Sequence, residues 1–377
     1  YASDIGLSIL QGGGSAMDAA VAMAAALGVT EPYSCGIGGG GFLLYRDAAT
    51  GLVHTIDGRE TAPMSYTETQ FTDASGAELD FDAVVNSGLS IGVPGTPAMW
   101  ALAAERFGTL PLGALLEPAE QLARRGFVVD QHFHYQTDEN AERFSRFPET
   151  SRVFLRDGSA PEVGSTFANP DLAEVYRRLR TEGIDVFYRG DIWAAILAEA
   201  NAPSAVSGQE VQGSPMTAAD LARYSPVLRA PTVSAYRGMT VFGMAAPSSG
   251  GVAVGEILNL LEHYELRTGV GLAQLGETDY LHRFSEACAT AFADRNRWVG
   301  DVADVPYAEL LGDGFAAERA EIMRPSSARP RPIPFGWPDG DYTTAPPAGA
   351  AQPPEALTKR PAMTRLPLRS EEHTSEL

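Results

Sequence analysis

The sequence predicts an α+β fold, because two kinds of pattern share the chain. Alanine-rich and amphipathic segments of helical length occur beside short runs rich in Leu, Val, Ile and Thr, which are typical of strands. Apolar residues make up 44% of the 377 residues, so the chain can bury a sizeable core. No apolar run reaches the roughly 18 residues that a membrane-spanning helix needs.

Two helices are predicted at the start of the chain. Ser3 can cap a helix over residues 4–11, and Gly12 can end it. The sequence "SAMD" at 15–18 is a Ser-x-x-Asp capping pattern that opens a second helix. That helix continues through "AAVAMAAALGV" and is apolar on every side, so we expect it to be buried in a core.

A β-hairpin is predicted next. Residues 42–46 and 52–57 have strand composition, and they flank "DAATG", which suits a hairpin loop. The polar segment "GRETAP" at 58–63 follows the second strand directly. Charged side chains held at the end of a strand are good candidates for a functional site.

The rest of the chain is predicted to mix helices and strands before a long linker. We expect helices within 92–108 and 112–129, near 171–182 and 190–200, and over 217–224, 252–264 and 280–301, with a strand over 239–244.

Composition divides the chain into a first part over 1–324, a Pro/Gly/Ala-rich linker over 325–368, and a tail over 369–377. The tail, "RSEEHTSEL", matches the translation of a common sequencing adapter, so we expect it to be non-native. Tyr1 is not a start Met, so we expect the natural N-terminus to lie upstream.

The net charge of −20 argues against DNA, RNA or an anionic membrane as the main partner, because an acidic surface repels all three. Cys35 and Cys288 are too few for a disulfide framework, and their apolar surroundings predict buried free thiols. His132 and His134 are two residues apart, which does not suit one face of a helix, so no metal site is predicted.

The run "CGIGGGGF" at 35–42 raises the question of a nucleotide site. It lacks the Lys of a P-loop, and it follows a helix and precedes a strand, the reverse of a dinucleotide-binding loop. We therefore expect these glycines to be structural, where backbones cross closely or φ is positive. On this interpretation, Gly39→Val should impair folding or self-processing.

Three further groups of residues could have functional roles. Arg59 could form an ion pair with Asp57 or Glu60, or its guanidinium could bind a substrate carboxylate. Ser248 and Ser249 could cap the following helix or line an anion-binding turn. Asp294 and Arg295 are best explained by a structural network that ties a helix to a loop.

Seven stretches, in this order along residues 3–312, resemble the large subunit of gamma-glutamyltranspeptidase. They are "GGGSAMDAAVAMAAALGVTEPYSCGIGGGGF", "DGRETAP", "GVPGTPAMWALAAERFG", "PAEQLARRGFVV", "MTAADLARY", "YRGMTVFGMAAPSSGG" and "FADRNRWVGDVADVP". Each stretch alone is a weak match, but seven collinear matches are specific.

The resemblance implies an N-terminal-nucleophile hydrolase fold of αββα layers, which would be incomplete here. It implies a precursor that cuts itself before a Thr, and this Thr then attacks γ-glutamyl compounds such as glutathione with its own α-amine as base. The acyl group would pass to water or to an amino acid or peptide. The resemblance also implies that the enzyme needs no cofactor, that a small subunit is the partner of this chain, and that the protein is exported. It further implies that Arg59 binds the α-carboxylate of the substrate.

The chain departs from the family at its end. The family's small subunit opens with Thr-Thr-His and a strand, whereas Thr343 and Thr344 precede the Pro-rich "APPAGAAQPP". We therefore expect the catalytic Thr to lie beyond this chain and the chain alone to be inactive. A cephalosporin or glutaryl acylase, a poly-γ-glutamate-processing relative and a non-catalytic binding protein remain as alternatives.

Overall fold

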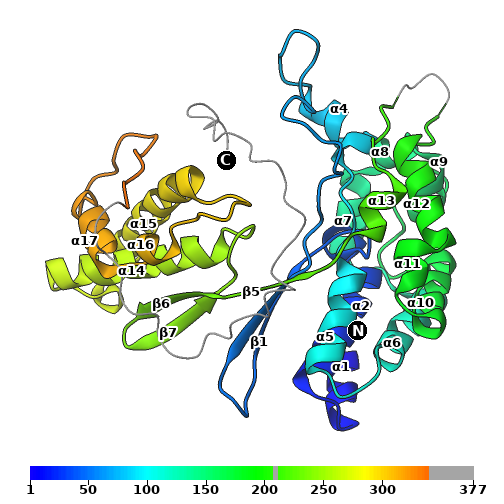
Figure 1. The fold of residues 1–377 in the computed structure, drawn as a ribbon, viewed down its shortest axis with the longest axis horizontal. Coiled ribbons are helices and arrows are strands. Elements are labelled where there is room, and N and C mark those ends of the chain that lie inside the picture. The colour runs from blue at the N-terminus through cyan, green and yellow to red at the C-terminus, as the bar shows by residue number, and fades with distance from the viewer. Residues whose placement is uncertain (207–210, 339–377) are drawn as a thin grey trace. The chain divides into compact units, whose positions relative to one another are not determined.

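The computed structural model describes residues 1–206 and 211–338. Runs of helices and a smaller number of strands form two compact units, as expected for an α+β chain (Figure 1). Among the described residues, the first unit comprises residues 1–41 and 57–226, and the second comprises residues 42–56 and 227–338. Residues 1–324 are thus shared between two units, and most of the predicted linker and the whole predicted tail lie outside the described residues.

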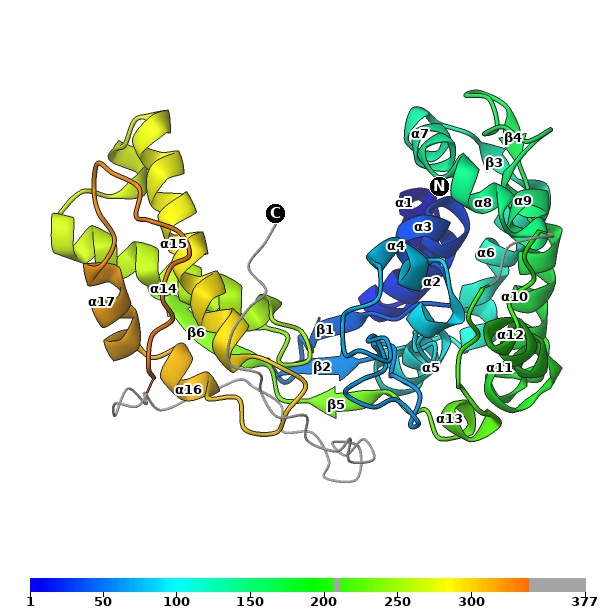
Figure 2. The same cartoon turned by 90° about the horizontal axis from the view of Figure 1, so that it is seen from above.

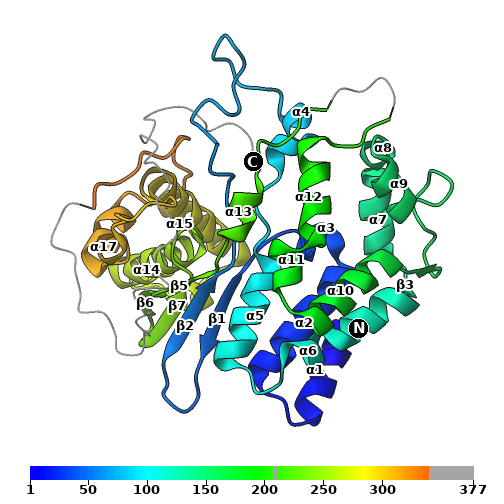
Figure 3. The same ribbon diagram turned by 45° about the vertical axis from the view of Figure 1, so that its right-hand side comes forward.

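The first unit is mainly helical, with α2 at its centre. Helix α2 packs against α1, α5 and α6, and α10 packs on α6 (Figure 3). The elements are α1 Ala2–Gln11, α2 Ala16–Thr30, α3 Pro32–Cys35, α4 Phe81–Val85, α5 Thr96–Phe107, α6 Leu112–Arg125, β3 Phe127–Val128, α7 Gln131–Glu139, α8 Ala141–Ser145, α9 Pro148–Phe154, β4 Thr166–Phe167, α10 Pro170–Glu182, α11 Asp185–Arg189, α12 Asp191–Asn201 and α13 Ala218–Ala222. Strands β3 and β4 pair antiparallel.

The second unit combines two small sheets with helices. Strands β1, β2 and β5 lie side by side in that order (Figure 2), and β6 pairs antiparallel with β7. Helix α14 packs on the β6–β7 hairpin and against α15 and α17. The elements are β1 Phe42–Arg46, β2 Val53–Asp57, β5 Val227–Arg229, β6 Thr232–Tyr236, β7 Met239–Gly243, α14 Gly250–Thr268, α15 Glu277–Trp298, α16 Tyr307–Leu310 and α17 Asp313–Glu321.

Several predicted elements are confirmed, and a few details are wrong. The hairpin of β1 and β2 and the capping box of Ser15 are present. Ser3 does not cap α1, because that helix already begins at Ala2. The helix predicted over 112–129 ends at Arg125, because Gly126 takes a φ of 87° that stops it before β3.

The prediction of two buried thiols is also wrong. Cys35 is exposed and Cys288 is only partly buried. Cys35 is the last residue of the four-residue helix α3, which leads straight into the glycine run, so few side chains are available to cover it.

The carboxylate of Asp18 anchors the buried helix α2. Its oxygens accept hydrogen bonds from the backbone N–H and hydroxyl of Ser15, at 2.7 and 2.8 Å. They also accept bonds from the Thr109 hydroxyl at 2.6 Å and from the backbone N–H groups of Thr109 and Leu110. Burial alone would raise the pKa of Asp18, but these bonds outweigh it and lower the pKa to about 2. Asp18 thus joins the start of α2 to the loop between α5 and α6.

The glycine run is a backbone crossing. Gly41 and Gly58 exchange backbone hydrogen bonds of 3.2 and 2.9 Å, and a Cβ on Gly40 would lie 2.7 Å from the Gly58 oxygen and from the Glu60 nitrogen. The Gly39 carbonyl accepts the N–H groups of Gly95 and Thr96 at the start of α5. A backbone oxygen therefore occupies the N-terminus of α5. No glycine of the run has a positive φ, so the glycines are explained by the close approach of neighbouring backbones.

We expect Asp18→Asn to lower the free energy of unfolding by about 1–3 kcal/mol, because it places an amide N–H against backbone donors. The folded pKa lies below the ordinary value of 3.8, so the carboxylate stabilises the fold above pH 3.8 and stops doing so as the pH falls towards 2. Urea unfolding from pH 2 to 7 measures this, with the exposed Asp4→Asn as control. Equal stability of the two variants at pH 7 would contradict the anchoring role.

We expect Gly40→Ala to cost about 1–3 kcal/mol of stability, because its methyl group would press on two backbones. Gly38→Ala is the matched control: it has open space at the Cβ position and should stay within about 0.5 kcal/mol of the wild type. Thermal unfolding of both variants measures the difference. If they unfold at the same temperature, the crossing does not confine Gly40.

Candidate functional site

Arg59 lies just beyond the end of β2, in the segment 58–63 that the sequence singled out. Its backbone N–H donates to the buried carboxylate of Asp57 at 3.0 Å. Its carbonyl accepts a 2.9 Å hydrogen bond from the hydroxyl of Tyr224. The backbone of Arg59 is thus held on both sides, while the residue itself is exposed.

A pair of tyrosines supports this backbone. Tyr224 stacks on Tyr188 with 5.7 Å between ring centroids and 8° between ring planes. The hydroxyl of Tyr188 donates to the Pro94 carbonyl at 2.9 Å, and burial raises the pKa of Tyr188, so it stays a neutral donor. A Cβ on Gly95 would collide with the Gly58 carbonyl and with the Tyr224 hydroxyl. The residue before Arg59 is therefore packed tightly against the start of α5.

The residues after Arg59 are also tied down. Thr61 and Val93 exchange two backbone hydrogen bonds, at 3.3 and 2.8 Å. The carboxylate of Asp220 accepts the backbone N–H of Met64 at 2.8 Å and caps α13 through Thr217. Burial would raise the pKa of Asp220, but these hydrogen bonds lower it overall, so it remains a charged acceptor. Residues 58–64 are therefore held in one backbone conformation before any substrate binds.

This geometry suits the recognition of a carboxylate. A guanidinium offers a planar fork of N–H donors that matches the two oxygens of a carboxylate. The carboxylate of Asp57 accepts the backbone N–H of Arg59, while that of Glu60 lies close to Gly39 and Gly40. A fixed backbone below a long cationic side chain restricts where a bound carboxylate can lie.

The other sequence candidates have structural contacts. Ser249 is the N-cap residue of α14 but forms no side-chain capping bond, whereas the Ser248 hydroxyl accepts the backbone N–H of Gly250 at 3.2 Å. Asp294 does join a structural network, but its partner is Arg319 at 2.8 Å and not its neighbour Arg295. Arg295 donates to the amide oxygen of Asn296 instead.

No three His, Cys, Asp or Glu side chains come together as a metal site within residues 1–206 and 211–338. His134 contacts the Pro161 carbonyl at 2.8 Å, and His132 lies 3.7 Å from Glu31. In the same residues, none of the helices has the length and apolar character needed to span a membrane.

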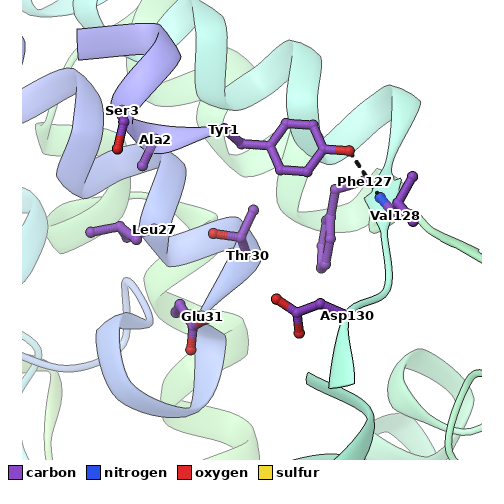
Figure 4. A pocket seen from close by; sticks show the side chains of 9 residues that line it. All are labelled: Tyr1, Ala2, Ser3, Leu27, Thr30, Glu31, Phe127, Val128 and Asp130. Carbon is purple, nitrogen blue, oxygen red and sulfur yellow. Dashed lines mark hydrogen bonds between the residues drawn. The ribbon is translucent and has the colours of Figure 1, made fainter. Parts of the chain in front are cut away.

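A pocket of about 260 Å³ lies elsewhere in the first unit (Figure 4). It is formed by the start of the chain, the end of α2 and the region of β3, where the Tyr1 hydroxyl accepts the N–H of Val128. The Asp130 carboxylate in its wall caps α7 through the N–H of Phe133. The lining includes no residue of the segment 58–63, so this pocket is separate from the candidate site.

The sequence reasoning identified Arg59 but missed its supporting residues. Tyr188, Asp220 and Tyr224 are more than 120 positions away in the sequence. Asp220 and Tyr224 lie in the predicted helix 217–224, and the capping pattern Thr-x-x-Asp was a usable signal for Asp220. No pattern in the sequence links either tyrosine to Arg59.

Comparison with known proteins places this chain among a group of enzymes. The model of the gamma-glutamyltranspeptidase family matches residues 2–356. The glutathione hydrolase proenzyme of Escherichia coli K12 is 34% identical over 87% of this chain and 55% of its own length. The acylase ACY 1 proenzyme of Pseudomonas sp. strain SE83 is 36% identical over 87% of this chain and 58% of its own length.

The fold is shared with solved structures of the same family. The gamma-glutamyltranspeptidase of Helicobacter pylori matches with a TM-score of 0.80 and 32% identity, over 88% of this chain and 93% of that chain. The fold is accordingly of the N-terminal-nucleophile hydrolase type. This chain spans about half the length of the curated relatives it matches. With a family match over nearly all of its residues, the chain belongs to the gamma-glutamyltranspeptidase family.

Proposed function

We propose that this chain is the large-subunit part of a self-processing γ-glutamyl hydrolase or transferase that acts on glutathione and related compounds. The observation that carries the proposal is the rigidly held segment around Arg59. The E. coli relative, a glutathione hydrolase proenzyme, supports the substrate class. The reacting nucleophile would be a threonine of the full-length protein, in the part that corresponds to the length of the relatives not spanned by this chain.

In this proposal, Arg59 positions the substrate and does not react. The α-carboxylate of a γ-glutamyl group is remote from the γ-carbonyl that is attacked. Binding it by a two-pronged guanidinium contact would orient the γ-carbonyl towards the threonine at little cost in entropy during the reaction. The threonine hydroxyl would attack the γ-carbonyl while its own α-amine takes the hydroxyl proton; the amide C–N bond then breaks, and the amine leaves with that proton. The γ-glutamyl ester that remains would be cleaved by water or by an acceptor amine, which frees the threonine hydroxyl again.

A second candidate is an acylase that removes glutaryl or related side chains from amides. The acylase relative at 36% identity favours it. A glutaryl group has a terminal carboxylate at the same distance from the reacting carbonyl as the γ-glutamyl α-carboxylate, so Arg59 would bind either. The γ-glutamyl group differs from the glutaryl group only by its α-amino group.

We expect Arg59→Ala in the full-length precursor to raise the KM for a γ-glutamyl anilide about 10- to 150-fold, because a charged hydrogen-bonded contact contributes about 1.5–3 kcal/mol. Arg59→Lys should raise the KM by a smaller factor, since lysine keeps the positive charge but lacks the planar pair of N–H donors. The control is Arg106→Ala, which removes an exposed arginine from the last turn of α5.

An unchanged KM in Arg59→Ala would contradict the role of Arg59. The same preparation distinguishes the two activities, because turnover of matched γ-glutamyl and glutaryl anilides can be compared. A higher kcat/KM for the glutaryl anilide would favour the acylase.

A further inference from the structure

Tyr224 contacts the residue that would bind the substrate carboxylate. It lies just after the end of α13 and donates its hydroxyl hydrogen to the Arg59 carbonyl at 2.9 Å. Asp220, within the same helix, accepts the backbone N–H of Met64 at 2.8 Å. Helix α13 and the residues after it therefore hold the segment 59–64 at both of its ends.

Tyr224 is itself held in place by Tyr188 of α11, a helix that packs against α13 (Figure 2). The two rings stack with 5.7 Å between their centroids and 8° between their planes. Tyr188 is 5% exposed, and its hydroxyl donates to the Pro94 carbonyl at 2.9 Å and accepts the N–H of Ala98 at 3.3 Å. A ring stacked on such a fixed neighbour has few alternative rotamers, so the Tyr224 hydroxyl stays in one place.

The hydroxyl of Tyr224 also fills a space that glycine leaves open. A Cβ atom on Gly95 would collide with this hydroxyl and with the Gly58 carbonyl. A side chain at position 95 would therefore push the hydroxyl away from the Arg59 carbonyl. The backbone at the start of α5 thus confines the hydroxyl on one side, and the ring of Tyr188 confines it through the ring of Tyr224.

The contact with the carbonyl matters because it restrains the backbone from which the guanidinium projects. The carbonyl belongs to the peptide group between Arg59 and Glu60, so the hydrogen bond limits the rotation of that peptide group. The 3.0 Å bond from the Arg59 N–H to Asp57 restrains the other side. A backbone rotation of about 10° moves the end of a side chain as long as arginine by about 1 Å. A shift of that size misaligns a two-pronged contact with a carboxylate.

We propose that Tyr224 is a positioning residue for substrate binding, which acts through the backbone of Arg59 and does not touch the substrate. This rests on the proposed function, in which the Arg59 guanidinium binds the substrate carboxylate. Removing the hydroxyl leaves the guanidinium, its charge and the bond to Asp57 in place, so substrate binding should weaken without being abolished. The loss cannot exceed what one neutral hydrogen bond contributes.

The test is Tyr224→Phe in the mature full-length protein, which removes one oxygen atom and keeps the ring on Tyr188. We expect kcat/KM for a γ-glutamyl anilide to fall about two- to fivefold, which corresponds to about 0.4–1 kcal/mol. The matched control is Tyr176→Phe, because the buried Tyr176 hydroxyl donates to the Ala25 carbonyl at 2.8 Å in the same unit. That variant loses the same kind of hydrogen bond, to a carbonyl of α2 instead of Arg59, and should keep the wild-type kcat/KM.

A double-mutant cycle tells positioning of Arg59 from a general loosening of the unit. In the Arg59→Ala background, Tyr224→Phe should cause no further loss of kcat/KM, because no guanidinium remains to be positioned. An equal loss in both backgrounds would overturn the proposal, and so would a wild-type kcat/KM in Tyr224→Phe alone or an equal loss in Tyr176→Phe. If Arg59→Ala itself keeps the wild-type kcat/KM, the proposed function is contradicted instead.

Discussion

The close approach of three backbones in the first unit is the constraint on which the candidate site depends. Residues 39–41, 58–61 and 93–95 hydrogen-bond to one another with no room for side chains at Gly40, Gly58 or Gly95. This packing holds the end of β2 against the start of α5, and Tyr188 and Tyr224 then fix the carbonyl groups of Pro94 and Arg59. The glycines therefore act on function only indirectly, by making the backbone below Arg59 rigid.

The second unit uses a different physical principle. There, the side chains of α15 hold an extended proline-rich segment with buried carboxylates and arginines. Glu256 is buried beside this cluster, and burial together with the negative charge of Asp294 raises its pKa well above the usual value. Both units thus hold an irregular segment in one position, the first by backbone packing and the second by charge.

The sequence predicted those features that depend on local chemistry. The Ser15–Asp18 box, the hairpin of β1 and β2 and the buried α2 follow from capping, turn composition and apolar pattern. Contacts between segments that are distant in the sequence could not be predicted, because periodicity says nothing about which residues of two separate elements meet. The contact of Tyr224 with Arg59 and that of Arg319 with Asp294 are examples. Another is the contact of Arg329 with Glu286, because composition alone predicted residues 325–368 as a linker.

The central claim is that the fixed backbone at the end of β2 presents Arg59 to a substrate carboxylate. A crystal structure of the mature full-length protein with bound L-glutamate tests this most directly. The account predicts two parallel hydrogen bonds of about 2.8 Å between the Arg59 guanidinium and the α-carboxylate, with the backbone bonds to Asp57 and Tyr224 intact. An α-carboxylate bound entirely by other residues, with the Arg59 guanidinium directed away from it, would contradict the account.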